Sequence, residues 1–169
     1  IRRLVHEGYS VRNIGRQMSI LEPQRASEIV SEIKAFDPKF VVHLAAHQTT
    51  LHNGASIVKV LESGVVLGSI MLEAALAANA TFLTTGSYWQ HGPDDSSSNV
   101  FYASAKDAFH ELSNFYRVKL GLSIREITLF DNYGPGDNRQ KLLPSLLRAT
   151  MTGEKVSLRR SDALINLTY

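Results

Sequence analysis

The chain has 169 residues, 44% of them hydrophobic and 20% charged, and 18 Lys and Arg against 16 Asp and Glu give a net charge of +2. This composition is that of one globular domain, or of a piece of a larger one, and it excludes disordered, collagen-like and coiled-coil chains. The lack of cysteine excludes disulfides, thiolate zinc sites and a cysteine nucleophile, and it fits the reducing cytoplasm.

The remaining bulk properties concern partners and location. The positive charges are scattered, so no nucleic-acid partner is expected. No apolar run reaches the roughly 18–20 residues that span a bilayer, and the N-terminal residues lack the apolar segment of a signal peptide. We therefore expect a soluble cytoplasmic protein without a membrane partner.

Both ends of the chain look cut. Residues 1–8 have the pattern of the second half of an amphipathic helix that stops at Gly8, and the apolar run 163–169 predicts a strand that is still open at Tyr169. Domains rarely end within a strand, so we interpret the sequence as the middle of a longer protein.

Helical and strand patterns alternate between these ends. Residues 23–36 have apolar side chains at helical spacing, and Asp37-Pro38 ends this helix because the residue before a proline is pushed out of the α region. The short apolar run 40–44 predicts a strand buried on both faces of a parallel sheet. The later elements are expected as a helix at 55–78, a strand at 81–85, a polar loop at 91–98, a helix at 101–120, a strand at 122–129 and a helix at 142–151.

Strands that alternate with crossover helices predict an α/β fold, a doubly wound parallel sheet of the Rossmann-like type that is truncated at both ends. Ligands of such folds bind beyond the carboxyl ends of the strands. Segments 43–50, 84–92 and 130–138 follow strand ends, so we expect them to converge on one cleft.

Tyr102 and Lys106 carry the strongest chemical signal. They stand four residues apart on a predicted helix, where Cβ atoms lie about 5–6 Å apart. An ammonium beside a phenol favours the phenolate and lowers the tyrosine pKa from about 10 toward neutrality, as a general acid and base near pH 7 requires. Taken alone, the same spacing is more often a solvated pair on a helix.

Around this pair the chain resembles the extended short-chain dehydrogenase/reductase family, the NAD-dependent epimerases and dehydratases of nucleotide sugars. In that family a Ser or Thr closes the strand before the helix and an aromatic residue follows four positions later, as Thr85 and Trp89 do here. The further matches are Val42-His43-Leu44-Ala45-Ala46, Gly68-Ser69 with Leu72-Glu73-Ala74-Ala75, and Tyr133-Gly134-Pro135-Gly136-Asp137. Five ordered motifs over nearly the whole chain argue against chance.

The resemblance implies a role for each matching residue. Tyr102 would exchange a proton with a sugar hydroxyl or keto oxygen, Lys106 would hold the nicotinamide ribose and lower the Tyr102 pKa, and Thr85 would orient the same oxygen. NAD or NADP would carry the hydride. The implied cofactor-binding residues are Leu44, Ala45, Ala46, Thr84, Tyr102 and Lys106, and the implied substrate-binding residues are His47, Ser87, Asp131, Asn132, Lys141 and Leu142. Residues 1–135 would form the dinucleotide-binding core, incomplete at its N-terminus, and 136–169 would begin the substrate-binding portion.

Several positions depart from the family's pattern. The Gly-rich phosphate loop would precede Ile1, and Gly64 and Val65 stand where the family has an asparagine. Asp131 resembles a subgroup close to the deoxysugar reductases. Ile165-Asn166 replaces an expected Arg-Asp, for which Arg159 or Arg160 could contact nucleotide phosphates instead, unless they form a solvated basic pair. Residues 12–16, which would select NAD or NADP, favour neither.

The end of strand 81–85 bears on the reaction. Dehydratases of this family place Asp-Glu directly after the threonine, because elimination of water needs a second acid–base pair. Gly86 and Ser87 occupy those positions, so we expect an epimerase or a reductase acting at C4 of a nucleotide sugar, with Asp131 slightly favouring the reductase. The alternative is a non-catalytic dinucleotide-binding sensor or scaffold, which has no need for a tuned phenol.

Two other sites and one assembly complete the expectations. His43, His47 and His52 lack helical spacing and an acidic partner, so no metal site is expected. A hydrolase is disfavoured because Ser87, His91 and Asp94 have no Gly-x-Ser-x-Gly elbow.

Helices 55–78 and 101–120 are apolar on more than one face, and the family pairs these helices across a dimer interface, so we expect a two-fold homodimer. The alternative is that a C-terminal region outside the sequence covers them.

Overall fold

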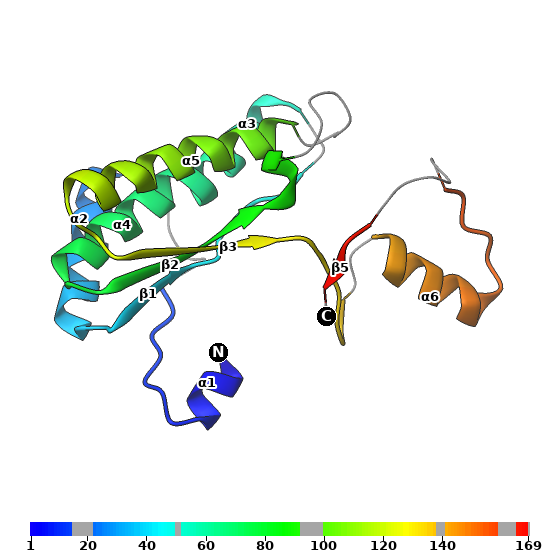
Figure 1. The fold of residues 1–169 in the computed structure, drawn as a ribbon, viewed down its shortest axis with the longest axis horizontal. Helices are drawn as coiled ribbons and strands as arrows, with labels where there is room; N and C mark the ends of the chain where they lie inside the picture. Colours follow the sequence, from blue (N-terminus) through cyan, green and yellow to red (C-terminus); the bar gives the residue numbers. More distant parts are fainter. Residues whose placement is uncertain (15–21, 50–51, 92–99, 138–140, 159–164, 169) are drawn as a thin grey trace. The chain divides into compact units, whose positions relative to one another are not determined.

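The computed structural model describes residues 1–14, 22–49, 52–91, 100–137, 141–158 and 165–168. The chain divides into two compact units, Ile1–Ile127 and Thr128–Tyr169. Figure 1 shows the elements of each unit, which are described separately below. The functional boundary expected after residue 135 lies within the second unit and stays a prediction.

A three-stranded sheet of order β1-β2-β3 forms the centre of the first unit. β1 (Phe40–His43) pairs in parallel with β2 (Thr81–Ser87), with His43 opposite Thr84. β3 (Ile124–Leu129) adjoins β2, and just before it the carbonyl of Ser123 accepts a hydrogen bond of 2.8 Å from Phe82 N–H. The three arrows run the same way in Figure 1, so the predicted parallel α/β sheet is confirmed.

Helices precede and connect these strands. They are α1 (Arg2–His6), α2 (Pro23–Phe36), α3 (Gly54–Leu61), the π-helix η1 (Glu62–Val66), α4 (Leu67–Ala77), the 3₁₀ helix η2 (Tyr88–His91) and α5 (Val100–Lys119). The core is built where α2, α4 and α5 pack on the sheet, around Ile29, Leu72, Phe82 and Phe109. Leu72 of α4 and Phe82, the second residue of β2, are completely buried.

The expectation that the first strand is buried on both faces is wrong for the described residues. Val41 and His43 are buried, whereas Phe40 and Val42 keep 55% and 52% of their surface exposed. Successive right-handed crossovers in one direction place the helices on the same face of a sheet. The helices between β1 and β3 therefore cover the Val41 side, and the described part of the chain leaves the Phe40 side open.

The helix expected at 55–78 is present but is not uniform. Asn53 caps its start, with its side chain accepting a hydrogen bond from Ser56 N–H, and the π-helix η1 interrupts the α-helical register in the middle. By length and composition alone, Gly54–Ala77 could cross a membrane, contrary to the expectation from the sequence. Core helices of soluble proteins meet the same criterion, and Met71, Leu72, Ala74 and Ala75 of this helix are buried in the core.

Two helices of the first unit end close to the residues that the sequence predicts. α2 ends at Asp37, which leaves the α region for the left-handed conformation at φ 51° rather than for an extended one. After α5, Gly121 adopts φ 71°, a value that favours glycine.

The second unit contains a short parallel pair and one helix. β4 (Asp131–Asn132) pairs with β5 (Leu167–Thr168), and α6 (Leu142–Thr152) contains Pro144 in its first turn and ends at Gly153 with φ 72°. The predicted helix at 142–151 is thus confirmed. Of the strand expected at 163–169, residues 167–168 form β5, whereas residues 163, 164 and 169 lie outside the described residues.

Candidate active site

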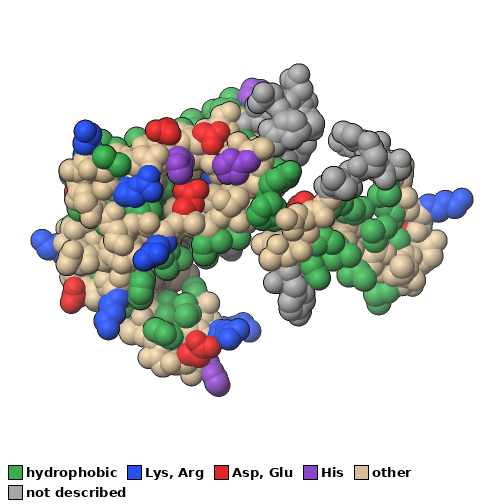
Figure 2. All heavy atoms as spheres, in the orientation of Figure 1, with side chains coloured by type: hydrophobic (Ala, Val, Ile, Leu, Met, Phe, Trp, Pro, Cys, Tyr) green, Lys and Arg blue, Asp and Glu red, His purple; other side chains and the backbone are tan. Residues whose placement is uncertain are grey.

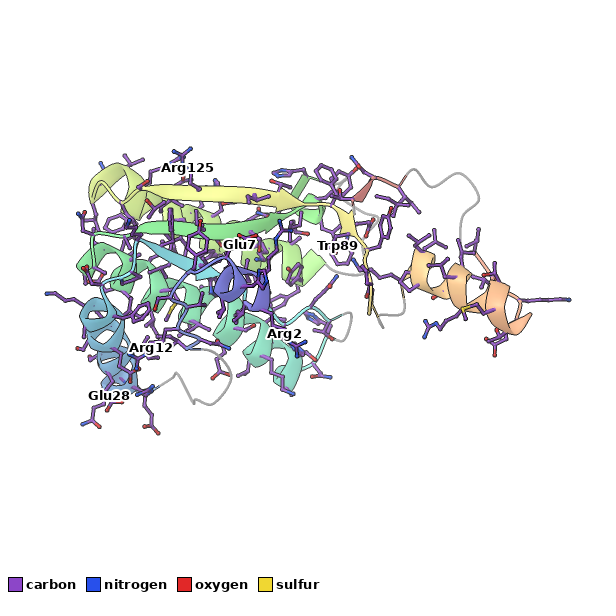
Figure 3. All side chains as sticks on the ribbon, turned by 90° about the horizontal axis from the view of Figure 1, so that it is seen from below. Arg2, Glu7, Arg12, Glu28, Trp89 and Arg125 are labelled. Carbon is purple, nitrogen blue, oxygen red and sulfur yellow. The ribbon has the colours of Figure 1, made fainter. Side chains whose placement is uncertain are left out.

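Tyr102 lies in the first turn of α5, close to the end of β2. Its half-buried ring packs edge-on against the indole of Trp89 in η2, with 6.2 Å between ring centroids and an interplanar angle of 85°. Figure 3 shows Trp89 just beyond the arrowhead of β2. This aromatic contact fixes the start of α5 against the carboxyl edge of the sheet.

Lys106 lies one turn further along α5 and is 93% buried, with 7% of its surface exposed. Its Nζ donates a hydrogen bond of 2.7 Å to the backbone oxygen of Thr85 and lies 6.0 Å from the centroid of the Tyr102 ring. The structure therefore brings Thr85, Tyr102 and Lys106 together, with Thr85 joined to Lys106 through its main chain.

The expected lowering of the Tyr102 pKa is not found in this structure. Burial raises the pKa of Tyr102 above its ordinary value. The Lys106 ammonium is bonded to the Thr85 carbonyl and not to the phenol oxygen. Burial also lowers the pKa of Lys106, and the carboxylate of Glu126 partly opposes that effect.

His43 and Thr84 face each other across the β1–β2 ladder on the helix side of the sheet. Both are buried, and Thr84 Oγ1 has no hydrogen-bond partner among the described residues. His43 Nε2 lies 3.3 Å from the Gly64 carbonyl oxygen, so Nε2 carries the proton in that contact. Burial, and secondly the charge of Lys106, lower the pKa of His43 to about 4, so this imidazole is neutral at pH 7.

The loop after β1 carries four of the residues that the family resemblance implicates. Leu44 and Ala46 are exposed, whereas Ala45 and His47 are half-buried. The backbone N–H of His47 donates a hydrogen bond of 2.9 Å to Ser63 Oγ in the π-helix η1. This bond ties the loop to η1 next to the His43–Gly64 contact.

The carboxyl end of β2 is held by Gln90. The backbone N–H of Ser87 donates 2.6 Å to Gln90 Oε1, and Gln90 Nε2 donates 2.9 Å to the carboxylate of Asp107 on α5. Of the hydrolase alternative, Ser87 and His91 are described, and Asp94 lies outside the described residues. Within the described ranges, no group of three or more His, Asp or Glu side chains could hold a metal ion.

The second unit contains the other four residues implicated in substrate binding. Lys141 Nζ lies 3.6 Å from Asp131 Oδ1, which joins the residue before α6 to β4. Asn132 is half-buried, and Leu142 begins α6 with 36% of its surface exposed. The convergence of segment 130–138 with the two loops of the first unit stays a prediction, and Arg159 and Arg160 lie outside the described residues.

Two polar residues near Lys106 were not expected from the sequence. His110 Nδ1 lies 3.0 Å from Glu126 Oε2, which joins α5 to β3. Figure 2 shows histidine and acidic side chains gathered over the region of α5 and β3. A helical interval of four already relates Tyr102, Lys106 and His110, and Glu126 is an acidic residue within a predicted strand, so both signals were present in the sequence.

The sequence profile of the NAD dependent epimerase/dehydratase family matches residues 1–164. The chain is 26% identical over 172 aligned residues to CDP-abequose synthase of Yersinia pseudotuberculosis, with 94% of this chain and 60% of that protein covered.

Solved structures give the same fold. UDP-N-acetylglucosamine 4-epimerase from Bacillus cereus superposes with a TM-score of 0.67 at 18% identity, covering 93% of this chain and 57% of that one. A double mutant of dTDP-glucose 4,6-dehydratase from Streptomyces venezuelae has a TM-score of 0.61 at 22% identity, covering 76% and 42%. The chain thus spans 60% or less of the length of each of these relatives.

Proposed function

Because the chain belongs to the NAD dependent epimerase/dehydratase family, we propose that it is part of an NAD- or NADP-dependent nucleotide-sugar epimerase or reductase that acts at C4. The observation that carries this proposal is the cluster of Thr85, Tyr102 and Lys106 at the carboxyl edge of β2. The similarity to CDP-abequose synthase, a protein named for a CDP-sugar product, supports a nucleotide-sugar substrate.

The polar groups at this edge suit the cofactor. Thr84 Oγ1 is a buried hydroxyl without a partner among the described residues, and Lys106 is a buried ammonium that donates a hydrogen bond to the Thr85 carbonyl. Buried polar groups are stable when they are hydrogen-bonded, and ribose hydroxyls would supply such bonds. Lys106 and Thr84 would hold the ribose, and the short side chains of Ala45 and Ala46 leave room for the dinucleotide. The bound cofactor supplies the hydride chemistry.

We assign the proton transfer to the phenol of Tyr102. Because burial raises its pKa, the phenol is protonated at neutral pH and is ready to donate to a keto oxygen. Thr85 orients that oxygen, and the Lys106 charge stabilises the phenolate that remains after donation. A phenol that is protonated at rest favours the reductive direction, in agreement with the interpretation of Asp131.

We assign His47 and Ser87 of the first unit, and Asp131, Asn132, Lys141 and Leu142 of the second, to the nucleotide sugar. The Asp131–Lys141 ion pair offers one charge of each sign, which suits a ligand with phosphate and hydroxyl groups.

We further propose that the protein does not catalyse 4,6-elimination. Gly86 and Ser87 carry no carboxylate, and a Cβ at position 86 would lie 2.5 Å from Glu126 Oε1, so an aspartate there would collide with a like charge. The test is product analysis with NDP-glucose substrates. A 4-keto-6-deoxy sugar among the products would contradict this part of the proposal.

The proposed assembly is a cytoplasmic homodimer that pairs the helices 55–78 and 101–120. Apolar side chains on these helices remain exposed, among them Val58, Leu61, Leu112, Phe115 and Val118. Their pairing across a two-fold axis would remove this surface from water.

The decisive experiment is hydride transfer by the full-length protein, followed at 340 nm with NADH or NADPH and a panel of 4-keto NDP-sugars. Tyr102→Phe should lower turnover by roughly 10²–10⁴-fold, whereas Tyr116→Phe, a matched change further along α5, should retain it. The alternative is a non-catalytic sensor or scaffold. Cofactor binding without turnover on any member of the panel would favour that alternative.

A further inference from the structure

Beside Tyr102 and Lys106, the same face of α5 carries a further polar residue that the proposed mechanism does not use. Tyr102, Lys106 and His110 follow at intervals of four, so their side chains lie on one stripe of the helix. Glu126 faces this stripe from β3, with Oε2 at 3.0 Å from His110 Nδ1. The Glu126 side chain is 27% exposed to solvent, and the His110 side chain is 44% exposed.

Gly86 provides the space for the Glu126 carboxylate. A Cβ on Gly86 would lie 2.5 Å from Glu126 Oε1 and 3.1 Å from Gln90 Oε1, closer than ordinary van der Waals contact allows. Gln90 Oε1 is already engaged by the backbone N–H of Ser87. The lack of a side chain at position 86 therefore lets the carboxylate extend from β3, past β2, toward α5.

Lys106 needs a negative charge nearby. It is buried, with 7% of its surface exposed, and a buried ammonium is costly unless an opposite charge compensates for the lost water. The titratable groups around it are His43 from β1, Glu126 from β3, and Tyr102 and His110 from α5. Of these four, Glu126 alone is negatively charged at pH 7, because the Tyr102 phenol stays protonated and histidines are neutral or cationic.

We propose that Glu126 is a positioning residue for Lys106: His110 holds its carboxylate in the space left by Gly86, and from there it keeps the ammonium charged and bonded to Thr85. The proposal rests on the proposed function, in which Lys106 binds the cofactor ribose. Glu126 does not itself touch the reacting atoms. Its effect reaches the cofactor through the charge of Lys106.

The test is the substitution Glu126→Gln, which keeps the shape and removes the charge, in the full-length protein. We expect the pKa of Lys106, followed by NMR of ¹⁵N-labelled lysine, to fall by about one unit, and NADH binding at pH 9 to weaken by at most about tenfold. Glu111→Gln, an exposed change beside His110 on the same helix, is the matched control and should alter neither value. An unchanged Lys106 titration in Glu126→Gln would overturn the proposal.

Gly86→Ala tests the same idea without changing any charge. Its methyl group would displace the carboxylate, so the Lys106 pKa should fall here too, and the double variant with Glu126→Gln should fall no further than Glu126→Gln alone. Additive decreases would contradict the proposal. The titration is measured without cofactor, so it decides the role of Glu126 even if neither NADH nor NADPH binds, an outcome that would count against the proposed function alone.

Discussion

The imidazole of His43, at the end of β1, reaches the π-helix η1, where its Nε2 lies 3.3 Å from the carbonyl oxygen of Gly64. A π-turn changes the backbone hydrogen-bond register of a helix and frees a carbonyl that needs another donor. The ring is enclosed by Phe82 and Phe109, with centroid distances of 6.3 and 5.4 Å. A neutral, buried histidine therefore links the strand, the π-helix and α5.

His43 makes the fold sensitive to acid. Its pKa is lowered from 6.5 to about 4, so the unfolded chain takes up the proton first as the pH falls. Stability is unaffected by this group above pH 6.5 and is lost as the pH drops from 6.5 toward 4, by about 2 kcal/mol between pH 7 and pH 5. Urea unfolding of wild type and His43→Gln at both pH values checks this: the variant should lose less stability on acidification by about that amount. Equal losses would contradict it.

Substitution of glycine by alanine should have opposite effects on stability at positions Gly68 and Gly64. A Cβ on Gly68 would overlap the ring of the buried Phe109, whereas a Cβ on Gly64 would meet nothing within 4 Å. Gly68→Ala should therefore destabilise the protein by about 1–3 kcal/mol through overpacking of α4 against α5. Gly64→Ala should be neutral or stabilising by up to about 1 kcal/mol, because alanine favours helix. Denaturant unfolding of both variants measures the difference, and similar values would show that Phe109 moves aside.

The helices of the first unit could be predicted well from the sequence. The bounds of α2 match the expected 23–36, and α5 begins one residue before the expected 101–120 and ends one residue before it, because apolar spacing and a terminal glycine are local signals. The π-helix could not be predicted in this way. The donor to its Gly64 carbonyl is His43, 21 residues earlier in the chain, so this contact depends on the tertiary structure.

The positions of the site residues could be predicted better from the sequence than their electrostatic interactions. The interval of four correctly places Lys106 beside Tyr102, but it does not say where the ammonium points, and the Thr85 carbonyl receives it. Burial raises the Tyr102 pKa. Likewise, the apolar run 40–44 does not reveal which face of β1 is covered, because coverage depends on the side to which the crossover helices pack.

Phe115 should be a central residue of the proposed dimer interface. It is 53% exposed on α5, between Leu112 and Val118, which are also exposed. Phe115→Glu would place a charge in the apolar contact and should convert the dimer to a monomer at micromolar concentration, as measured by light scattering. Val5→Glu, at an exposed apolar position on α1, is the control and should remain dimeric. A monomeric wild-type protein would contradict the assembly itself.

Lys106→Met separates the two tasks of the lysine. The Lys106 Nζ lies 6.0 Å from the centroid of the Tyr102 ring, a distance at which a unit charge is worth about 3 kcal/mol near a protein surface. Loss of this charge should raise the Tyr102 pKa beyond the rise that burial already causes, so the basic limb of the pH profile of kcat/KM should move upward by more than one unit. Cofactor binding should weaken because the proposed contact between the ammonium and the ribose is lost. Both are measured on the full-length protein, by steady-state kinetics and by titration of NADH fluorescence.

Tyr102→Phe provides the contrast to Lys106→Met. It should leave cofactor binding nearly intact and lower the rate by roughly 10²–10⁴-fold, because only proton transfer is lost. Thr85→Ala should cost less than Tyr102→Phe, since its hydroxyl orients the substrate oxygen without exchanging a proton, and the Lys106 hydrogen bond goes to its main chain, which the substitution retains. If Lys106→Met preserves both the pH profile and the cofactor affinity, the Tyr102–Lys106 pair is a structural feature of α5, and the chain is a dinucleotide-binding fold without this catalytic mechanism.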